Sequence, residues 1–307
     1  MADRHTHLIE RAAARLAETQ LARPDASQTR RAFDVPTPAT SKLPLLGLQP
    51  SAGVQPDSAP TAPHTPELQI DTIGLRKAGL MQDPDSRVAE EFRIIQTRLL
   101  RQSFGANGSA ASQCRNLVMI TSALKGEGKS FVSINLAGEI ARQKDRRVLL
   151  LDVDPKLHGL SRIFGAASAR GLLDLARDPR LSPAELILPT ASEGLDVLPV
   201  GQSDKRSGEV FASRRMGEVI EAIAEHYSDR LIIIDAPPCL ASSTPHALAS
   251  ICGQAVVVVA ANSTQETDVE AALELLQVCP HVSLLLNKVA PWMTHSFGSY
   301  SYLAAEA

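Results

Sequence analysis

Short apolar runs alternate with amphipathic stretches from residue 117 onward. The runs are rich in aliphatic and β-branched residues, which predicts strands at Leu117–Thr121, Val148–Asp152, Leu195–Val200, Leu231–Asp235, Ala255–Ala261 and Val282–Leu286. Helical spacing of apolar positions predicts helices over Ser130–Lys144, Gly208–His226 and Glu266–Val278. Because nearly continuous apolar strands alternate with helices, we expect an α/β fold with a doubly wound, mostly parallel sheet covered on both faces.

Other segments flank this region. Residues 1–20 carry apolar side chains at helical spacing, which predicts a short amphipathic helix that needs a partner surface. Nine of the 20 prolines lie in residues 21–82, which we predict to be a largely disordered linker. Helical periodicity returns over Asp83–Arg101, so the α/β domain is predicted to span residues 83–290, followed by a flexible tail, residues 291–307.

Composition narrows the function classes. The 31 Lys+Arg and 34 Asp+Glu give a net charge of −3, which argues against a nucleic-acid partner. No apolar run approaches the roughly 20 residues of a membrane helix, and a signal-peptide pattern is missing. We therefore expect a cytoplasmic protein without a direct membrane span. The four widely spaced cysteines predict reduced thiols in a core rather than a metal site or disulfides.

The segment from Ser122 to Ser130 follows a predicted strand and opens a predicted helix. It matches the phosphate-loop pattern G-x-x-x-x-G-K-[ST] except at Ala123, where the pattern has glycine. Its glycines let backbone N–H groups converge on phosphate oxygens, Lys129 can reach the β/γ-phosphates, and Ser130 can ligate Mg²⁺. A plain tight turn is the alternative. The expected nucleotide-binding residues of the loop are Ala123, Leu124, Lys125, Gly126, Glu127, Gly128, Lys129 and Ser130.

Three aspartates stand at the ends of predicted strands. Asp152 and Asp154 follow one strand, and Asp235 ends another. A single aspartate there is more often a cap or turn residue, but three beside a phosphate loop predict a nucleotide site at the carboxyl edge of the sheet. Since Mg²⁺ on a nucleotide takes only one or two carboxylates, one aspartate is left for acid–base work.

The segments LVMITSALKGEGKS, VLLLDVDPK and LIIIDAPP resemble the Walker A, A′ and B motifs of bacterial tyrosine kinases, the BY-kinases. GLSRIFGAASARGLLDLARDP and ALASICGQAVVVVAANSTQ resemble the exosortase-associated exopolysaccharide branch of that family. The resemblance covers the chain from about Asp83 to its C-terminus. It implies a P-loop fold related to partitioning ATPases, ATP as phosphate donor, and tyrosines of the C-terminal tail as acceptors. It also implies a membrane chain-length regulator, a polysaccharide co-polymerase, as activating partner at the inner membrane.

Two of the three tyrosines in the chain, Tyr300 and Tyr302, lie in the tail and alternate with serines. We predict that they are the phosphoacceptors; the alternative is that these aromatic side chains pack on the domain. Asn287 ends the last strand near the position where related nucleotide enzymes read adenine, although a turn residue is an equally ordinary interpretation.

The sequence departs from the family in three places. Lys156 stands where the A′ motif often has arginine, so a bidentate contact is not assumed. Leu124 occupies the position of the signature lysine of partitioning ATPases, which favours the kinase class. The family's oligomerisation pattern falls on Glu90, Arg93 and Gln96, whose third position is not basic; a homo-oligomer is still expected, with a solvated helix face as the alternative.

These observations combine into one mechanistic hypothesis. Ser130, Asp154 and Asp235 hold Mg²⁺ on ATP, Lys129 neutralises charge on the phosphates, and Asp152 is the base that takes the tyrosine proton. The chain is then a protein-tyrosine autokinase that regulates exopolysaccharide polymerisation or export. Two alternatives stay open: a partitioning or positioning ATPase, and a catalytically weak nucleotide-binding adaptor of the export machine.

Overall fold

The computed structural model describes residues 75, 82–83, 85–105, 114–143, 146–155 and 159–289. The predicted N-terminal helix, almost all of the linker, and the tail that carries Tyr300 and Tyr302 lie outside the described residues, as does Lys156. The boundaries assigned to those segments stay predictions.

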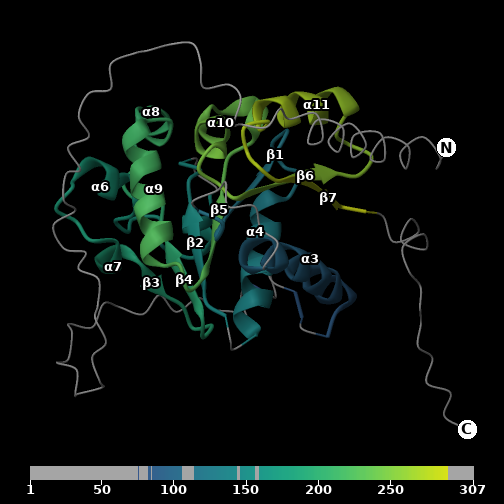
Figure 1. Ribbon diagram of the computed structural model, residues 1–307, viewed down its shortest axis with the longest axis horizontal. Coiled ribbons are helices and arrows are strands. Elements are labelled where there is room, and N and C mark those ends of the chain that lie inside the picture. Colours follow the sequence, from purple (N-terminus) through teal and green to yellow (C-terminus); the bar gives the residue numbers. More distant parts are fainter. Residues whose placement is uncertain are drawn as a thin grey trace, which may run out of the picture.

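A seven-stranded sheet forms the centre of the described domain (Figure 1). Its strand order is β3-β4-β2-β5-β1-β6-β7, and every pairing is parallel except that of β3 with β4. The strands are β1 (Leu117–Ser122), β2 (Val148–Asp152), β3 (Leu188–Pro189), β4 (Leu195–Leu198), β5 (Leu231–Asp235), β6 (Gln254–Ala260) and β7 (Val282–Asn287). The predicted doubly wound α/β fold is confirmed, and the six predicted strands agree with the observed bounds within two residues. The two-residue β3 is too short to give a sequence pattern.

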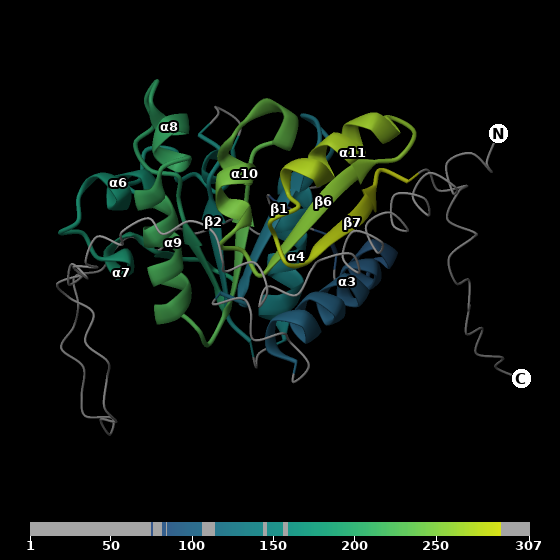
Figure 2. The same ribbon diagram turned by 45° about the horizontal axis from the view of Figure 1, so that its top comes forward.

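Helices cover both faces of this sheet (Figures 1 and 2). They are α3 (Arg87–Phe104), α4 (Lys129–Arg142), α5 (Leu160–Ile163), α6 (Leu172–Arg177), α7 (Pro183–Leu186), α8 (Ser207–Phe211), α9 (Arg214–His226), α10 (Thr244–Ala249) and α11 (Glu266–Leu275), with a 3₁₀ turn η1 (Cys239–Ala241). Successive side chains of a strand point to opposite faces. In β1, Val118 and Ile120 therefore join the core under α3 and α4, whereas Leu117 and Met119 join the core under α9, α10 and α11.

One predicted helix is interrupted in the structure, so its prediction as a single helix is wrong. The stretch predicted as a single helix over Gly208–His226 forms two helices, α8 and α9, with the break at Ser213. The Ser213 side chain accepts a hydrogen bond from the backbone N–H of Met216 (3.2 Å) and so caps the start of α9. A serine that satisfies a free N–H at a helix start stabilises a new helix at that point, because the first four N–H groups have no partner inside the helix.

Candidate nucleotide site

The segment between β1 and α4 has the backbone of a phosphate-binding loop. Gly126 and Gly128 adopt φ angles of 86° and 100°, in the left-handed region that favours glycine. A Cβ atom on Gly128 would lie 2.1 Å from Nδ2 of Asn287, so a larger residue here would displace the Asn287 amide. Helix α4 begins at Lys129, directly after the loop, and the free N–H groups at a helix start are suited to bind an anion.

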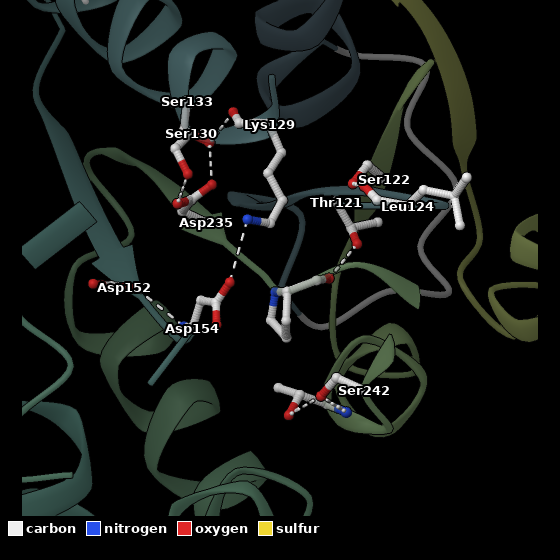
Figure 3. Close-up of polar contacts among 12 residues, drawn as sticks. Thr121, Ser122, Leu124, Lys129, Ser130, Ser133, Asp152, Asp154, Asp235 and Ser242 are labelled. Atoms are coloured by element: carbon white, nitrogen blue, oxygen red, sulfur yellow. Dashed lines mark hydrogen bonds and ion pairs between the residues drawn. The ribbon is translucent and has the colours of Figure 1, made fainter. Parts of the chain in front are cut away.

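Lys129 and Asp154 form an ion pair within this site (Figure 3). Nζ of Lys129 lies 3.2 Å from Oδ2 of Asp154, and both side chains are largely buried. Lys129 comes from the start of α4, and Asp154 follows the end of β2. The sheet order, which places β5 between β1 and β2, thus brings together two residues that the sequence predicts as partners of the same nucleotide.

Asp235, at the end of β5, accepts hydrogen bonds from two serines of α4 (Figure 3). Ser130 Oγ donates to Oδ2 (2.7 Å), and Ser133 Oγ donates to Oδ1 (2.9 Å). Burial raises the pKa of the fully buried Asp235 carboxyl, while the charge of Lys129 and the two hydroxyl groups oppose that rise. Ser133 is a site residue that the sequence prediction missed. Its only sequence signal is its position one helical turn from Lys129 and Ser130.

Asp152 pairs with Asp235 in the register of β2 and β5, but its carboxylate has other partners. Oδ1 accepts the backbone N–H of Asp154 (3.0 Å), and Oδ2 accepts both the N–H (2.7 Å) and the Oγ (2.6 Å) of Ser161. Burial, followed by the charge of Asp235, raises the pKa of Asp152 to about 7 against the lowering effect of these hydrogen bonds. Ser161, which also accepts the N–H of Val200 (2.9 Å), was not predicted.

The oxygen atoms of Ser130, Asp154 and Asp235 form a donor set that suits Mg²⁺ bound to a nucleotide. In the described part of the chain, no three His, Cys, Asp or Glu side chains are grouped closely enough to hold a metal ion by themselves. Mg²⁺ usually keeps several water ligands and binds through one or two carboxylates plus substrate phosphates. The residues present therefore fit a metal ion that arrives with phosphate oxygens.

Side-chain hydrogen bonds hold the phosphate loop in place. Nδ2 of Asn287 donates to the carbonyl oxygen of Glu127 (2.8 Å), and Nζ of Lys288 donates to that of Gly126 (2.6 Å). The buried carboxylate of Glu127 accepts the backbone N–H of Leu124 (2.6 Å) and the hydroxyl of Thr264. The predicted role of Asn287 in reading adenine stays a prediction, and the contacts of Lys288 and Thr264 were not foreseen.

The pattern that resembles an oligomerisation motif lies on α3. Arg93 forms ion pairs with Glu90 and with the buried Glu139 (3.8 Å for the latter). Gln96 is fully buried, and its amide atoms have no hydrogen-bond partner among the described residues. The Gln96 side chain is therefore part of the domain interior and is not presented to a neighbouring chain.

A strand–loop–helix unit with a lysine and a serine at its end, next to carboxylates on two neighbouring strands, defines a P-loop nucleotide-binding protein. Residues 113–286 match the ParA family model, described as NUBPL iron-transfer P-loop NTPase, and the chain belongs to this family.

Several relatives of this chain are named as tyrosine-protein kinases. The tyrosine-protein kinase ptk of Acinetobacter johnsonii is 31% identical over 218 residues, which cover 69% of this chain and 28% of ptk. The tyrosine-protein kinase YwqD of Bacillus subtilis is 28% identical over 199 residues, which cover 65% of this chain and 79% of YwqD. The structure of the VpsO kinase domain aligns with a TM-score of 0.52 and 27% identity over 67% of this chain and 100% of that domain.

The chain spans about a quarter of the length of several curated relatives that it matches, ptk among them. None of the helices in the described ranges is both long enough and apolar enough to cross a membrane.

Proposed function

We propose that this chain is an ATP-dependent protein-tyrosine autokinase that phosphorylates Tyr300 and Tyr302 of its own C-terminal tail. The observation that carries the proposal is the meeting of Lys129, Asp154 and Asp235 around one phosphate loop. The similarity to proteins named tyrosine kinases, over about two thirds of the chain for ptk and YwqD, supports kinase chemistry on this site.

In this mechanism the loop N–H groups and the start of α4 bind the phosphates of ATP. Ser130, Asp154 and Asp235 hold Mg²⁺, which offsets the charge of the phosphate oxygens when it is bound. Lys129 leaves Asp154 and moves to the β/γ-phosphates. The transition state of phosphoryl transfer is loose, so most of the acceleration comes from positioning and from charge neutralisation by these side chains.

Asp152 is the proposed base. A free tyrosine hydroxyl has a pKa near 10 and needs a group that accepts its proton as transfer proceeds. Ser161 donates to Oδ2 of Asp152 with both its N–H and its hydroxyl. Among the described residues, Oδ1 accepts only the N–H of Asp154, so it can still accept the tyrosine proton while Ser161 stays on Oδ2, which makes Asp152→Asn and Ser161→Ala informative as a pair. The first variant should lose phosphotyrosine formation, whereas the second should keep it.

The partner and location follow from the same proposal. We infer a membrane chain-length regulator as partner, a peripheral position at the inner membrane through that partner, and a role in exopolysaccharide polymerisation or export. The test is phosphorylation of the tail, followed by mass spectrometry, with and without the cytoplasmic part of a candidate regulator. Equal labelling in both reactions would contradict activation by that partner.

The central experiment compares wild type with Lys129→Met after incubation with ATP and Mg²⁺. The readout is tail phosphotyrosine, measured by mass spectrometry, and Lys205→Met is the matched control because Lys205 is exposed and remote in sequence from the loop. We expect labelling of wild type and of the control only. Labelling of the Lys129→Met tail would overturn the assignment.

The ParA family match favours ATP hydrolysis as the second candidate function. Steady phosphate release by wild type without tail labelling would select that candidate. Nucleotide binding with neither activity would select a catalytically weak adaptor of the export machine.

A mixing experiment tests for transfer between copies in a homo-oligomer. Lys129→Met full-length chains are combined with active chains that end at Val289, and label is sought on the full-length tail. Label there indicates transfer from one copy to another, and its absence contradicts transfer between copies and removes that argument for a homo-oligomer.

A further inference from the structure

Two adjacent residues at the end of β7 bind the backbone of the phosphate loop. Asn287 donates to the carbonyl of Glu127 (2.8 Å), and Lys288 donates to the carbonyl of Gly126 (2.6 Å). We propose that Asn287 and Lys288 are positioning residues that turn the loop N–H groups toward the phosphates of the bound nucleotide. The inference deepens the proposed function, because it concerns the nucleotide-binding half of that function.

The geometry of the peptide bond connects these two contacts to the phosphate site. In a trans peptide, the C=O of one residue and the N–H of the next point in opposite directions, and the described residues contain no cis peptide. A hydrogen bond to the Gly126 carbonyl from outside therefore directs the N–H of Glu127 inward. The bond to the Glu127 carbonyl directs the N–H of Gly128 inward in the same way. Two consecutive peptide planes are thus fixed by neighbouring side chains.

The sheet holds the backbone of Asn287 in place. β7 pairs with β6 along its whole length, from Val282 opposite Ala255 to Asn287 opposite Ala260. The carbonyl of Asn287 then accepts the N–H of Ala261 (2.8 Å), which extends the pairing by one bond. Because Asn287 is anchored through its backbone, its side chain presents the amide at a fixed place.

Lys288 has an unusual backbone conformation that serves this contact. Its φ is 58°, in the left-handed region that non-glycine residues seldom adopt. The chain changes direction here at the end of the strand, and the ammonium group lies against the loop. Although Lys288 is exposed, its charge lies beside the segment that must bind the anionic phosphates.

Glu127 also supports the loop, through its side chain. Its carboxylate is buried and accepts the N–H of Leu124 and the hydroxyl of Thr264, which lies between β6 and α11. A carboxylate aimed at the phosphates would repel them, and these contacts hold it elsewhere. The loop is therefore fixed through one side chain and two backbone carbonyls, all bound by the segments around the ends of β6 and β7.

The test measures nucleotide affinity without requiring any catalysis. Full-length wild type, Lys288→Met, Lys288→Arg and Asn287→Ala are titrated with a fluorescent ADP analogue in the presence of Mg²⁺. Lys205→Met is the control, because Lys205 is also an exposed lysine. Thermal unfolding of each nucleotide-free variant reports whether the fold is intact.

We expect Lys288→Met and Asn287→Ala to bind the analogue about tenfold more weakly, the effect of losing one hydrogen bond that orients the site. Lys288→Arg should restore the affinity to within about twofold of wild type, because it keeps a cationic donor. The thermal midpoint of Lys288→Met should equal that of Lys205→Met.

Wild-type affinity in Lys288→Met would overturn the proposal, as would equal weakening in Lys205→Met. A Lys288→Arg variant as weak as Lys288→Met would also overturn it, since the role assigned here needs only a cationic donor. If wild type forms no phosphotyrosine but the affinities follow the expected order, the kinase proposal fails and the positioning role stands.

Discussion

The ammonium group of Lys129 lies 3.2 Å from the carboxylate of Asp154, so each holds the other before a nucleotide arrives. In the proposed complex, Lys129 pairs with phosphate and Asp154 with Mg²⁺. Binding of Mg²⁺ and ATP together therefore exchanges one ion pair for two. ATP without Mg²⁺ would have to separate Lys129 from Asp154 and leave a carboxylate next to the phosphates.

The first prediction concerns Asp154→Asn. This change removes the competitor for Lys129 and a negative charge beside the phosphates, so metal-free ATP should bind several-fold, up to about tenfold, more tightly. Tail phosphorylation with Mg²⁺ should be lost. Binding is measured by calorimetry in EDTA, and Asp178→Asn is the control because Asp178 pairs only with the exposed Arg180 in the contacts described. Weaker metal-free binding in Asp154→Asn would contradict the role of the ion pair.

The second prediction separates the two serines that bind Asp235. Ser130→Ala removes a proposed metal ligand, so the Mg²⁺ concentration for half-maximal activity should rise by about tenfold. Ser133→Ala leaves one oxygen of a buried carboxylate without its donor, which should lower the free energy of unfolding by about 1–3 kcal/mol. Mg²⁺ titrations and urea unfolding of both variants measure these effects. Identical Mg²⁺ requirements in the two variants would show that the site assignment is incorrect.

The third prediction is a stabilising substitution. Gln96 is fully buried and its amide atoms find no hydrogen-bond partner in the described domain, so its desolvation is uncompensated. Gln96→Leu should raise the free energy of unfolding by about 1–2 kcal/mol. Arg98→Leu, on the exposed side of α3, should change it by less than about 0.5 kcal/mol. Urea unfolding measures both free energies. A destabilised Gln96→Leu would mean that the amide has a partner in the full chain.

The fourth prediction concerns the cysteines, which are all free and buried, as the sequence predicts. Burial raises the pKa of Cys114 to about 11 and raises that of Cys252 well above its ordinary value. Because the thiolate is the reactive form, the native protein should react slowly with a disulfide reagent at pH 8. Raising the pH to about 9, still below the raised pKa of Cys114, should accelerate the reaction by up to about tenfold, because the small thiolate fraction grows in proportion. In denatured protein, all four thiols should react with the reagent at once. Fast labelling of native protein would refute this assignment.

The strands were predictable because a strand that is buried on both faces needs an apolar residue at nearly every position. All residues of β1, β2 and β5 are buried, so these runs are apolar almost throughout and end at polar residues that face the site. The loop sequence likewise predicted its own conformation, since Gly126 and Gly128 occupy the positions with positive φ. The helix break at Ser213 was missed because apolar spacing continues across it, although the capping serine was visible in the sequence.

Long-range partners could not be predicted in the same way. Ser133 and Asp235 are 102 residues apart, and Asn287 lies 160 residues from the carbonyl that it binds. No local pattern specifies such pairs, because they depend on the order of strands in the sheet. Asp152 illustrates the difference. Its place at a strand end was predictable, but its hydrogen bonds from the N–H and hydroxyl of Ser161 were not.

The position of β7 limits how the chain can be shortened. A deletion intended to remove only the acceptor tyrosines must leave Asn287 and Lys288 in place, because a cut even a few residues earlier also releases the carbonyls of Gly126 and Glu127. Such a fragment would keep the phosphate loop and the three aspartates in its sequence, but its loop would lack these two backbone contacts. Loss of activity in that fragment would report on the loop rather than on the missing tyrosines.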